Sequence, residues 1–276
     1  MAYLRHTFLP SFYPRFWMKT VLHLLTPGGY GYIRKLRQQE DTNYLHDRDK
    51  HQVRLKHHGE GGWKLEKKGD LLQRDYSNYE EYVTHQKQKL DEMLKMKGGF
   101  SNWDICEYRL KFYRRFKHLK PLLPKSALIL CCGARQGTEV EVLHDLGFRN
   151  AYGIDLNPGP DNQIVRPGDF MKLQEEESSL DLLYTNCVDH AFDLDAMIEE
   201  HTRVLKPGGF LLYDLGTNME KGAGGPFEAV AWDRTEDLVI RLLRKFEKLI
   251  QAQRDDHFGG AWLWILVQKK KEPFSS

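Results

Sequence analysis

Short apolar runs alternate with helical segments from about residue 125 onward. The runs cover residues 127–132, 151–155, 180–185, 210–215 and 262–268. Helical spacing of apolar positions covers residues 138–146, 193–205 and 235–245. Continuous apolar runs of this length are typical of strands that are buried on both faces, and their alternation with helices is typical of a parallel sheet. The pattern therefore predicts an α/β fold with a doubly wound, mostly parallel sheet.

Two helices are predicted ahead of this half from their capping patterns. Ser77 is followed three residues later by Glu80, and apolar positions then recur at spacings of three and four. Ser101 and Asp104 repeat the arrangement before a second amphipathic stripe. Such pairs satisfy the free N–H groups of a helix start. Residues 40–70 are instead rich in charge, histidine and glycine, so we expect a loop or lid there.

Composition limits the classes of protein that fit. Of the 276 residues, 41% are hydrophobic, which is enough for a globular core and excludes a wholly disordered chain. The longest apolar stretch, residues 261–267, is far shorter than the ~20 residues of a membrane-spanning helix. The four cysteines form no CxxC pair, and His57-His58 beside Glu60 is typical of a solvated stretch. We therefore expect neither a disulfide scaffold nor a metal site, and a reducing, cytoplasmic location.

Charge is distributed unevenly along the chain. Residues 1–125 carry 25 Lys and Arg against 14 Asp and Glu, whereas residues 126–276 carry 16 against 25. The first 39 residues contain no acidic residue and eight aromatic ones. This segment predicts a helical arm packed on the domain; contact with an anionic membrane surface and an organelle-targeting presequence are the alternatives.

The turn after the first predicted strand is the expected ligand site. That strand leads into Gly133 and Gly137 just before a helix, and the second strand ends in Asp155. Glycines let the backbone approach a ligand, helix N–H groups face it, and a carboxylate at the second tip can accept ribose hydroxyls. A nicotinamide-dependent oxidoreductase uses the same features, so the turn alone leaves two cofactors open.

The ordered set of motifs is more specific. They are Cys131-x-Gly133-x-Arg135-x-Gly137, Gly153-Ile154-Asp155, Gly168-Asp169-Phe170, Asp181-Leu182-Leu183-Tyr184 and Leu205-Lys206-Pro207-Gly208-Gly209. Together, over about residues 125–215, they resemble the class I S-adenosylmethionine (SAM)-dependent methyltransferases. The resemblance implies a Rossmann-like fold, SAM as the cofactor and methyl transfer as the reaction.

The resemblance also assigns a cofactor role to nine positions. It implies that Gly133, Ala134, Arg135 and Gly137 surround the methionine part, that Asp155 and Leu156 hold the ribose, that Asp169 and Phe170 face the adenine, and that Asn186 lies beside the reactive methyl.

This chain departs from the family pattern at three places. Cys131 stands where an acidic residue is usual, and Arg135 where a second glycine is usual. Arg135 either pairs with the carboxylate of the methionine part or points to solvent. Only eight residues separate Asp155 from Ile164, too few for a covered crossover, so we expect no full helix there.

Candidate catalytic residues follow the strand over residues 180–185. Asp189 and His190 offer a carboxylate and an imidazole, and His190 is the predicted general base because its pKa ordinarily lies near neutrality. The alternative is that His190 packs beneath the cofactor. Four side chains are predicted to contact the acceptor: Tyr82, His85, Lys89 and Trp232.

The sequence thus predicts a SAM-dependent methyltransferase that acts on an oxygen or nitrogen of a small molecule or glycan. The glycan option rests on residues 79–90, which look similar to regions preceding methyltransferase domains in some bacterial surface-glycan proteins. Residues 1–100 are predicted to form a basic extension that completes the acceptor site, and residues 101–276 the SAM-binding domain. The alternative is a catalytically inactive protein of this fold, bound to a partner or to a membrane through residues 1–39. Nucleic acid is the less favoured substrate, because no recognised binding motif is present.

Overall fold

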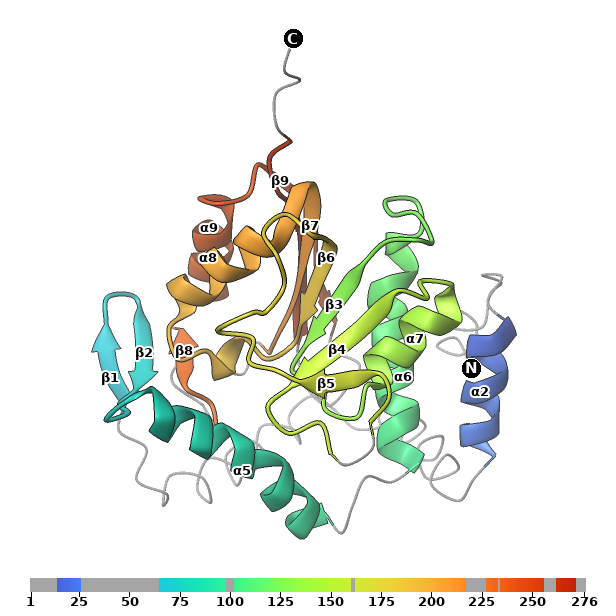
Figure 1. The fold of residues 1–276 in the computed structure, drawn as a ribbon, viewed down its shortest axis with the longest axis horizontal. Coiled ribbons are helices and arrows are strands. Elements are labelled where there is room, and N and C mark those ends of the chain that lie inside the picture. Colours follow the sequence, from blue (N-terminus) through green and yellow to red (C-terminus); the bar gives the residue numbers. More distant parts are fainter. Residues whose placement is uncertain are drawn as a thin grey trace, which may run out of the picture.

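The computed structural model describes residues 14–25, 65–97, 102–159, 162–216, 227–232, 234–255 and 262–271. Its centre is a seven-stranded sheet with the order β5-β4-β3-β6-β7-β10-β9 (Figure 1). The strands are β3 (Ile129–Cys132), β4 (Ala151–Asp155), β5 (Val165–Pro167), β6 (Leu180–Thr185), β7 (Leu205–Gly216), β9 (Lys248–Asp255) and β10 (Trp262–Gln268). The five strands β3 to β7 pair in parallel, and β10 runs antiparallel to both β7 and β9. The predicted mostly parallel α/β sheet is confirmed.

The described helices are α2 (Pro14–Leu24), α5 (Tyr79–Lys97), α6 (Asn102–Phe116), α7 (Thr138–Leu146), α8 (Leu194–Val204) and α9 (Thr235–Leu243), with 3₁₀ turns η2 (Lys117–Leu119) and η3 (Val188–His190). Helices α6 and α7 cover one face of the sheet, and α8 and α9 cover the other (Figure 1). In β3, Ile129 and Cys131 pack in the core beneath α6 and α7, whereas Leu130 and Cys132 pack in the core beneath α8. Burial on both faces explains why the predicted strands read as continuous apolar runs.

The edge strand β9 had no apolar run to reveal it. Most of its side chains are exposed or half-buried, because β10 is its one partner among the described strands. Charged and polar side chains on such a strand discourage pairing with another chain. Between β4 and β5, residues 156–159 and 162–164 contain no helix, as the short connection predicts.

A second, smaller sheet corrects the expectation of a loop at the end of residues 40–70. Strands β1 (Leu65–Lys68) and β2 (Leu71–Arg74) form a hairpin, and β2 pairs with β8 (Val230–Trp232), which comes much later in the chain. This pairing could not be predicted from local composition, because its partner is distant in sequence. Residues 40–64 lie outside the described part of the chain.

The start of α5 lies one residue later than the predicted capping pair. The side chain of Asn78 accepts the N–H of Glu81 at 2.9 Å, and Glu81 accepts the N–H of Ser77 at 2.6 Å. The cap is therefore formed by Asn78 with Glu81, not by Ser77 with Glu80. The second predicted helix is confirmed as α6, and Ser101 lies outside the described residues.

The N-terminal segment is described only over residues 14–25. There Phe16 of α2 is buried and stacks on Tyr113 of α6, with ring centroids 4.4 Å apart. Among the described residues, no helix is both long and apolar enough to cross a membrane. The boundary near residue 100 stays a prediction.

Candidate functional site

A cavity of about 220 Å³ opens beyond the carboxyl ends of β3 and β6. Its lining comes from five segments of the chain: the turn and helix start after β3 (Gly133, Ala134, Arg135, Gln136, Thr138, Glu139), the segment after β6 (Asn186, Cys187, Asp189, His190), one face of α6 (Ile105, Tyr108, Phe112), Glu228 before β8, and Trp262 at the start of β10. The carboxyl ends of parallel strands are where ligands bind in such sheets.

The turn after β3 requires glycine at two positions. Gly133 has a φ of +71°, and a Cβ there would lie 2.6 Å from the sulfur of Cys187. Gly137 has a φ of +86°, and a Cβ there would lie 2.8 Å from Ile164. Positive φ disfavours other residues, and the close approach leaves no room for a side chain. The two glycines thereby let the turn pack closely against Cys187 and Ile164.

Arg135 adopts a φ of +46° in the same turn. A side chain in this left-handed region costs on the order of 1 kcal/mol, which is why glycine is usual there. Burial opposes the charge of the guanidinium, but Tyr108, Cys187 and Asp155 outweigh it and hold the pKa of Arg135 above its ordinary value. A permanent cation therefore lines the cavity.

Asp155, at the tip of β4, is fixed by backbone groups. One carboxylate oxygen accepts the N–H of Arg135 at 3.0 Å, and the other accepts the N–H of Asn157 at 2.9 Å. An ionised carboxylate has about four acceptor positions, so two remain. Asp155 joins the glycine turn to the tip of the next strand, although neither it nor Leu156 is among the residues that line the cavity.

The predicted adenine position is also fixed, and by an unforeseen partner. The hydroxyl of Tyr79, on α5, donates to one oxygen of Asp169 at 2.6 Å, and the N–H of Met171 donates to the other at 2.9 Å. Burial and the bond to Asp169 raise the pKa of Tyr79, so the phenol remains a donor.

The neighbouring residue, Phe170, is held through its carbonyl by a buried histidine. His201 lies 3.0 Å from that carbonyl through Nε2, and its Nδ1 lies 2.8 Å from the hydroxyl of Tyr213. Burial lowers the pKa of His201 to about 4, so the ring is neutral, donates to Phe170 and accepts from Tyr213.

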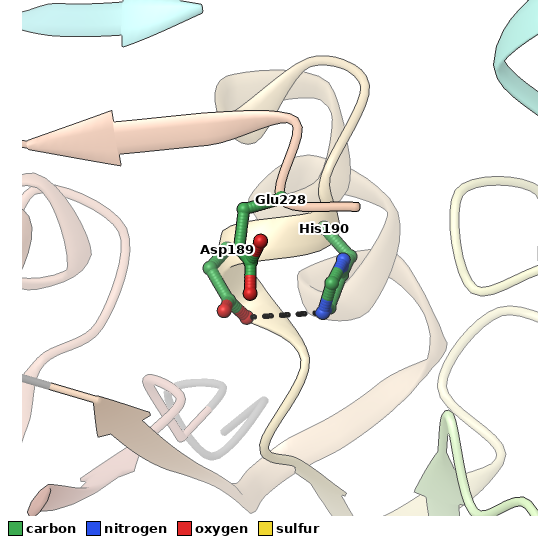
Figure 2. Close-up of side chains that lie close together, drawn as sticks. All are labelled: Asp189, His190 and Glu228. Atoms are coloured by element: carbon green, nitrogen blue, oxygen red, sulfur yellow. Dashed lines mark ion pairs between the residues drawn. The ribbon is translucent and has the colours of Figure 1, made fainter. Parts of the chain in front are cut away.

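At the other end of the cavity, Asp189, His190 and Glu228 converge (Figure 2). One ligand atom from each lies within 4.8 Å of the others. His190 is 6% exposed; its Nδ1 lies 2.8 Å from the carbonyl oxygen of Phe227, and its Nε2 lies 3.8 Å from Asp189. A carbonyl can only accept, so Nδ1 carries the proton and Nε2 is directed toward the carboxylates.

The segment that carries Glu228 is held by hydrogen bonds to three elements: η3, β2 and α5. The N–H of Ala229 donates to the carbonyl of Asp189 at 2.8 Å, and the N–H of Arg74 donates to the carbonyl of Ala229 at 2.7 Å. The side-chain amide of Gln86, on α5, donates to the carbonyl of Phe227 at 2.7 Å. The hairpin and α5 thus set the position of Glu228.

Of the four predicted acceptor residues, Tyr82, His85 and Trp232 do not line the cavity. Tyr82 is buried and donates to the carbonyl of His190 at 3.0 Å. His85 lies 2.9 Å from the hydroxyl of Tyr76 and stacks on Phe227. Trp232 is 1% exposed within β8, and the Lys89 side chain lies outside the description. The structure brings Gly133, Ala134, Arg135, Asn186, Asp189 and His190 together around the cavity.

Two cavity carboxyl groups were not foreseen from the sequence. Glu139 follows the glycine turn, and burial raises its pKa to about 8. Its position in the first turn of a helix after a ligand loop was a usable signal. Glu228 had none, because only the pairing of β2 with β8 brings it to His190.

Comparisons with known proteins show what the chain resembles in sequence and in fold. A family model described as a methyltransferase domain matches residues 130–213. No curated protein matches the chain. One similar solved structure is 1,6-didemethyltoxoflavin-N1-methyltransferase of Burkholderia thailandensis, with bound 1,6-didemethyltoxoflavin and S-adenosylhomocysteine. It is 17% identical to this chain with a TM-score of 0.56, and the match covers 73% of this chain and 95% of that one. A SAM-dependent methyltransferase of Aquifex aeolicus is 16% identical with a TM-score of 0.46, over 62% of this chain and 100% of that one.

Proposed function

Because residues 130–213 form a methyltransferase domain of the class I SAM-dependent superfamily, we propose that the chain methylates an oxygen or nitrogen of a small-molecule or glycan acceptor. The observation that carries the proposal is the glycine turn after β3. Its backbone lines a cavity, and Asp155 fastens it to the tip of β4. The acceptor would lie at the other end of the same cavity.

The residues around the turn fit SAM. Gly133 lines the cavity without a side chain, and the two acceptor positions of Asp155 that no described residue uses suit two ribose hydroxyls. Arg135 supplies a cation for the carboxylate of the methionine part, a charge-assisted contact. When bound, SAM supplies a methyl group whose bond to sulfur breaks with its electron pair left on sulfur, while a lone pair of the acceptor forms the new bond.

The acceptor end has the groups that such an acceptor needs. Hydroxyl and amine acceptors donate hydrogen bonds, and Asp189, His190 and Glu228 all accept them there. An acceptor that loses a proton on methylation can transfer it to this cluster. Because β2 and α5 hold the segment carrying Glu228, we propose that the N-terminal region completes the acceptor site.

Transfer of label from methyl-tritiated SAM tests the proposed function. The full chain is incubated with a small-molecule extract and, separately, with a glycan extract, and the labelled products are separated by chromatography. We expect SAM-dependent labelling in one extract that is lost in Asp155→Ala. If the chain binds S-adenosylhomocysteine but labels nothing in either extract, the inactive binding protein is favoured. If it does not bind S-adenosylhomocysteine, SAM is not its cofactor.

A further inference from the structure

The cluster at the acceptor end has the composition and geometry of a cation site. We infer that Asp189, His190 and Glu228 bind one divalent metal ion of the first transition series. Their three ligand atoms lie within 4.8 Å of one another, on two segments that are joined by the hydrogen bond from Ala229 to Asp189 (Figure 2). Ligands of such an ion lie roughly 3 to 3.5 Å apart, given metal bonds of about 2 Å, so small side-chain rotations complete the site.

One oxygen of Glu228 provides an independent observation. Its Oε2 is buried and has no hydrogen-bond partner among the described residues. A buried, unpaired carboxylate oxygen costs several kcal/mol unless a cation or donor meets it. Arg74 interacts electrostatically with Glu228 but does not donate to this oxygen. The unsatisfied atom belongs to a carboxylate that converges on a second carboxylate and an imidazole.

His190 is oriented as a metal ligand. Its Nδ1–H donates to the carbonyl of Phe227, which leaves Nε2 directed at the cluster. Metal-binding histidines usually donate their other ring N–H in this way, and the contact fixes both the tautomer and the ring. A neutral ring would direct its lone pair at the Asp189 carboxylate 3.8 Å away, a repulsive arrangement that a cation between them reverses.

The donor set indicates the kind of ion. Two carboxylates and one imidazole suit Mn²⁺, Fe²⁺, Co²⁺ or Zn²⁺ better than Ca²⁺ or Mg²⁺, which prefer oxygen alone. Three protein ligands leave positions open, as in catalytic rather than structural metal sites. All three residues line the cavity, so the open positions face the space where the proposed function puts the acceptor. With the ion bound, the metal would replace the free side chains in that role: it would bind an acceptor oxygen and favour its deprotonated form, with the proton released to solvent.

Direct binding to the metal-stripped full chain tests the site without any turnover. After dialysis against a chelator, Co²⁺ is titrated and its visible absorption recorded, with Zn²⁺ and Mg²⁺ followed by calorimetry. We expect one Co²⁺ or Zn²⁺ per chain and much weaker Mg²⁺ binding. Glu228→Gln and Asp189→Asn should each weaken Co²⁺ binding at least tenfold, whereas the exposed control Glu236→Gln should leave it unchanged.

Absence of binding up to about 1 mM Co²⁺, or binding that neither substitution weakens, would overturn the metal site. Circular dichroism checks that each variant is folded. If Asp189→Asn does not fold, Glu228→Gln alone tests the site. S-adenosylhomocysteine binding to the metal-free chain is measured separately. A chain that binds the metal but not S-adenosylhomocysteine would contradict the proposed function alone. A chain that binds S-adenosylhomocysteine but no metal would contradict the metal site alone.

Discussion

The two ends of the proposed ligand site hold their carboxylates in opposite ways. At the proposed nucleotide end, outside the lining of the cavity, Asp155 and Asp169 each accept two hydrogen bonds from the protein itself. At the acceptor end, Glu228 has a buried oxygen without a hydrogen-bond partner among the described residues, next to Asp189 and His190. Carboxylates held in place beforehand bind a neutral ligand without reorganising, whereas a converging unsatisfied cluster is suited to a cation. The contrast predicts different responses to substitution at the two ends.

Glu139, in the first turn of α7, gives the largest expected effect. Burial raises its pKa to about 8, from an ordinary value near 4.5. Between these pH values the folded chain keeps a proton that the unfolded chain has lost, so the free energy of unfolding falls as the pH rises through this window. In Glu139→Gln that fall should shrink by about 3 to 5 kcal/mol, as measured by urea unfolding from pH 5 to 8. The exposed control is Glu80→Gln, and equal pH dependence in wild type and Glu139→Gln would show that Glu139 is ionised in the fold.

Asp155→Asn tests the nucleotide end. Asparagine has the same shape but turns an NH₂ toward one of the backbone N–H donors, so the side chain loses both its orientation and its charge. Affinity for S-adenosylhomocysteine should fall at least ~100-fold by calorimetry, about 2.7 kcal/mol. Asp75→Asn, on an exposed side chain, should bind like wild type. A change of less than about threefold in Asp155→Asn would remove the ribose role.

Tyr79→Phe asks whether fixing Asp169 matters. Loss of the hydroxyl frees one carboxylate oxygen, and we expect affinity for S-adenosylhomocysteine to fall roughly 3- to 10-fold, in line with the net contribution of about 0.5 to 1.5 kcal/mol of a typical hydrogen bond. The matched control is Tyr152→Phe, whose hydroxyl donates to Glu175 instead. Tighter binding by Tyr79→Phe would mean that the hydroxyl competes with the ligand.

Arg135→Gly has the smallest expected effect. Glycine relieves the left-handed conformation, so the free energy of unfolding should rise by about 0.5 to 1 kcal/mol. Ser178, with a φ of +55°, offers the matched control Ser178→Gly outside the cavity. A loss of stability in Arg135→Gly beside a gain in Ser178→Gly would show that contacts of the Arg135 side chain exceed the backbone strain.

The parts of the fold that were predictable are those specified locally. Strands β4, β6 and β10 begin and end at the predicted residues, because runs buried on both faces are mostly apolar. Helix α7 does as well, because Gly137 and Gly147 flank it in left-handed conformations. The polar edge strand β9 and the sheet of β1, β2 and β8 were not predictable, since their stability comes from pairing with distant segments.

The same division holds for the candidate site. The glycine turn and Asp155 could be located from strand ends, and Asp189 with His190 from the end of β6. Tyr79 and Glu228 could not, because each reaches its partner from an element outside the parallel sheet. Of the four predicted acceptor residues, Tyr82 bonds to the carbonyl of His190, His85 lies beside Tyr76, and Trp232 is buried in β8. Their contact with the acceptor stays a prediction.

A crystal structure of the chain with S-adenosylhomocysteine tests the central claim most directly. The account predicts that the ribose hydroxyls lie within hydrogen-bond distance of the Asp155 carboxylate, with the homocysteine part against the backbone of Gly133. Ligand bound elsewhere, or a turn after β3 that remains empty under saturating ligand, would contradict it.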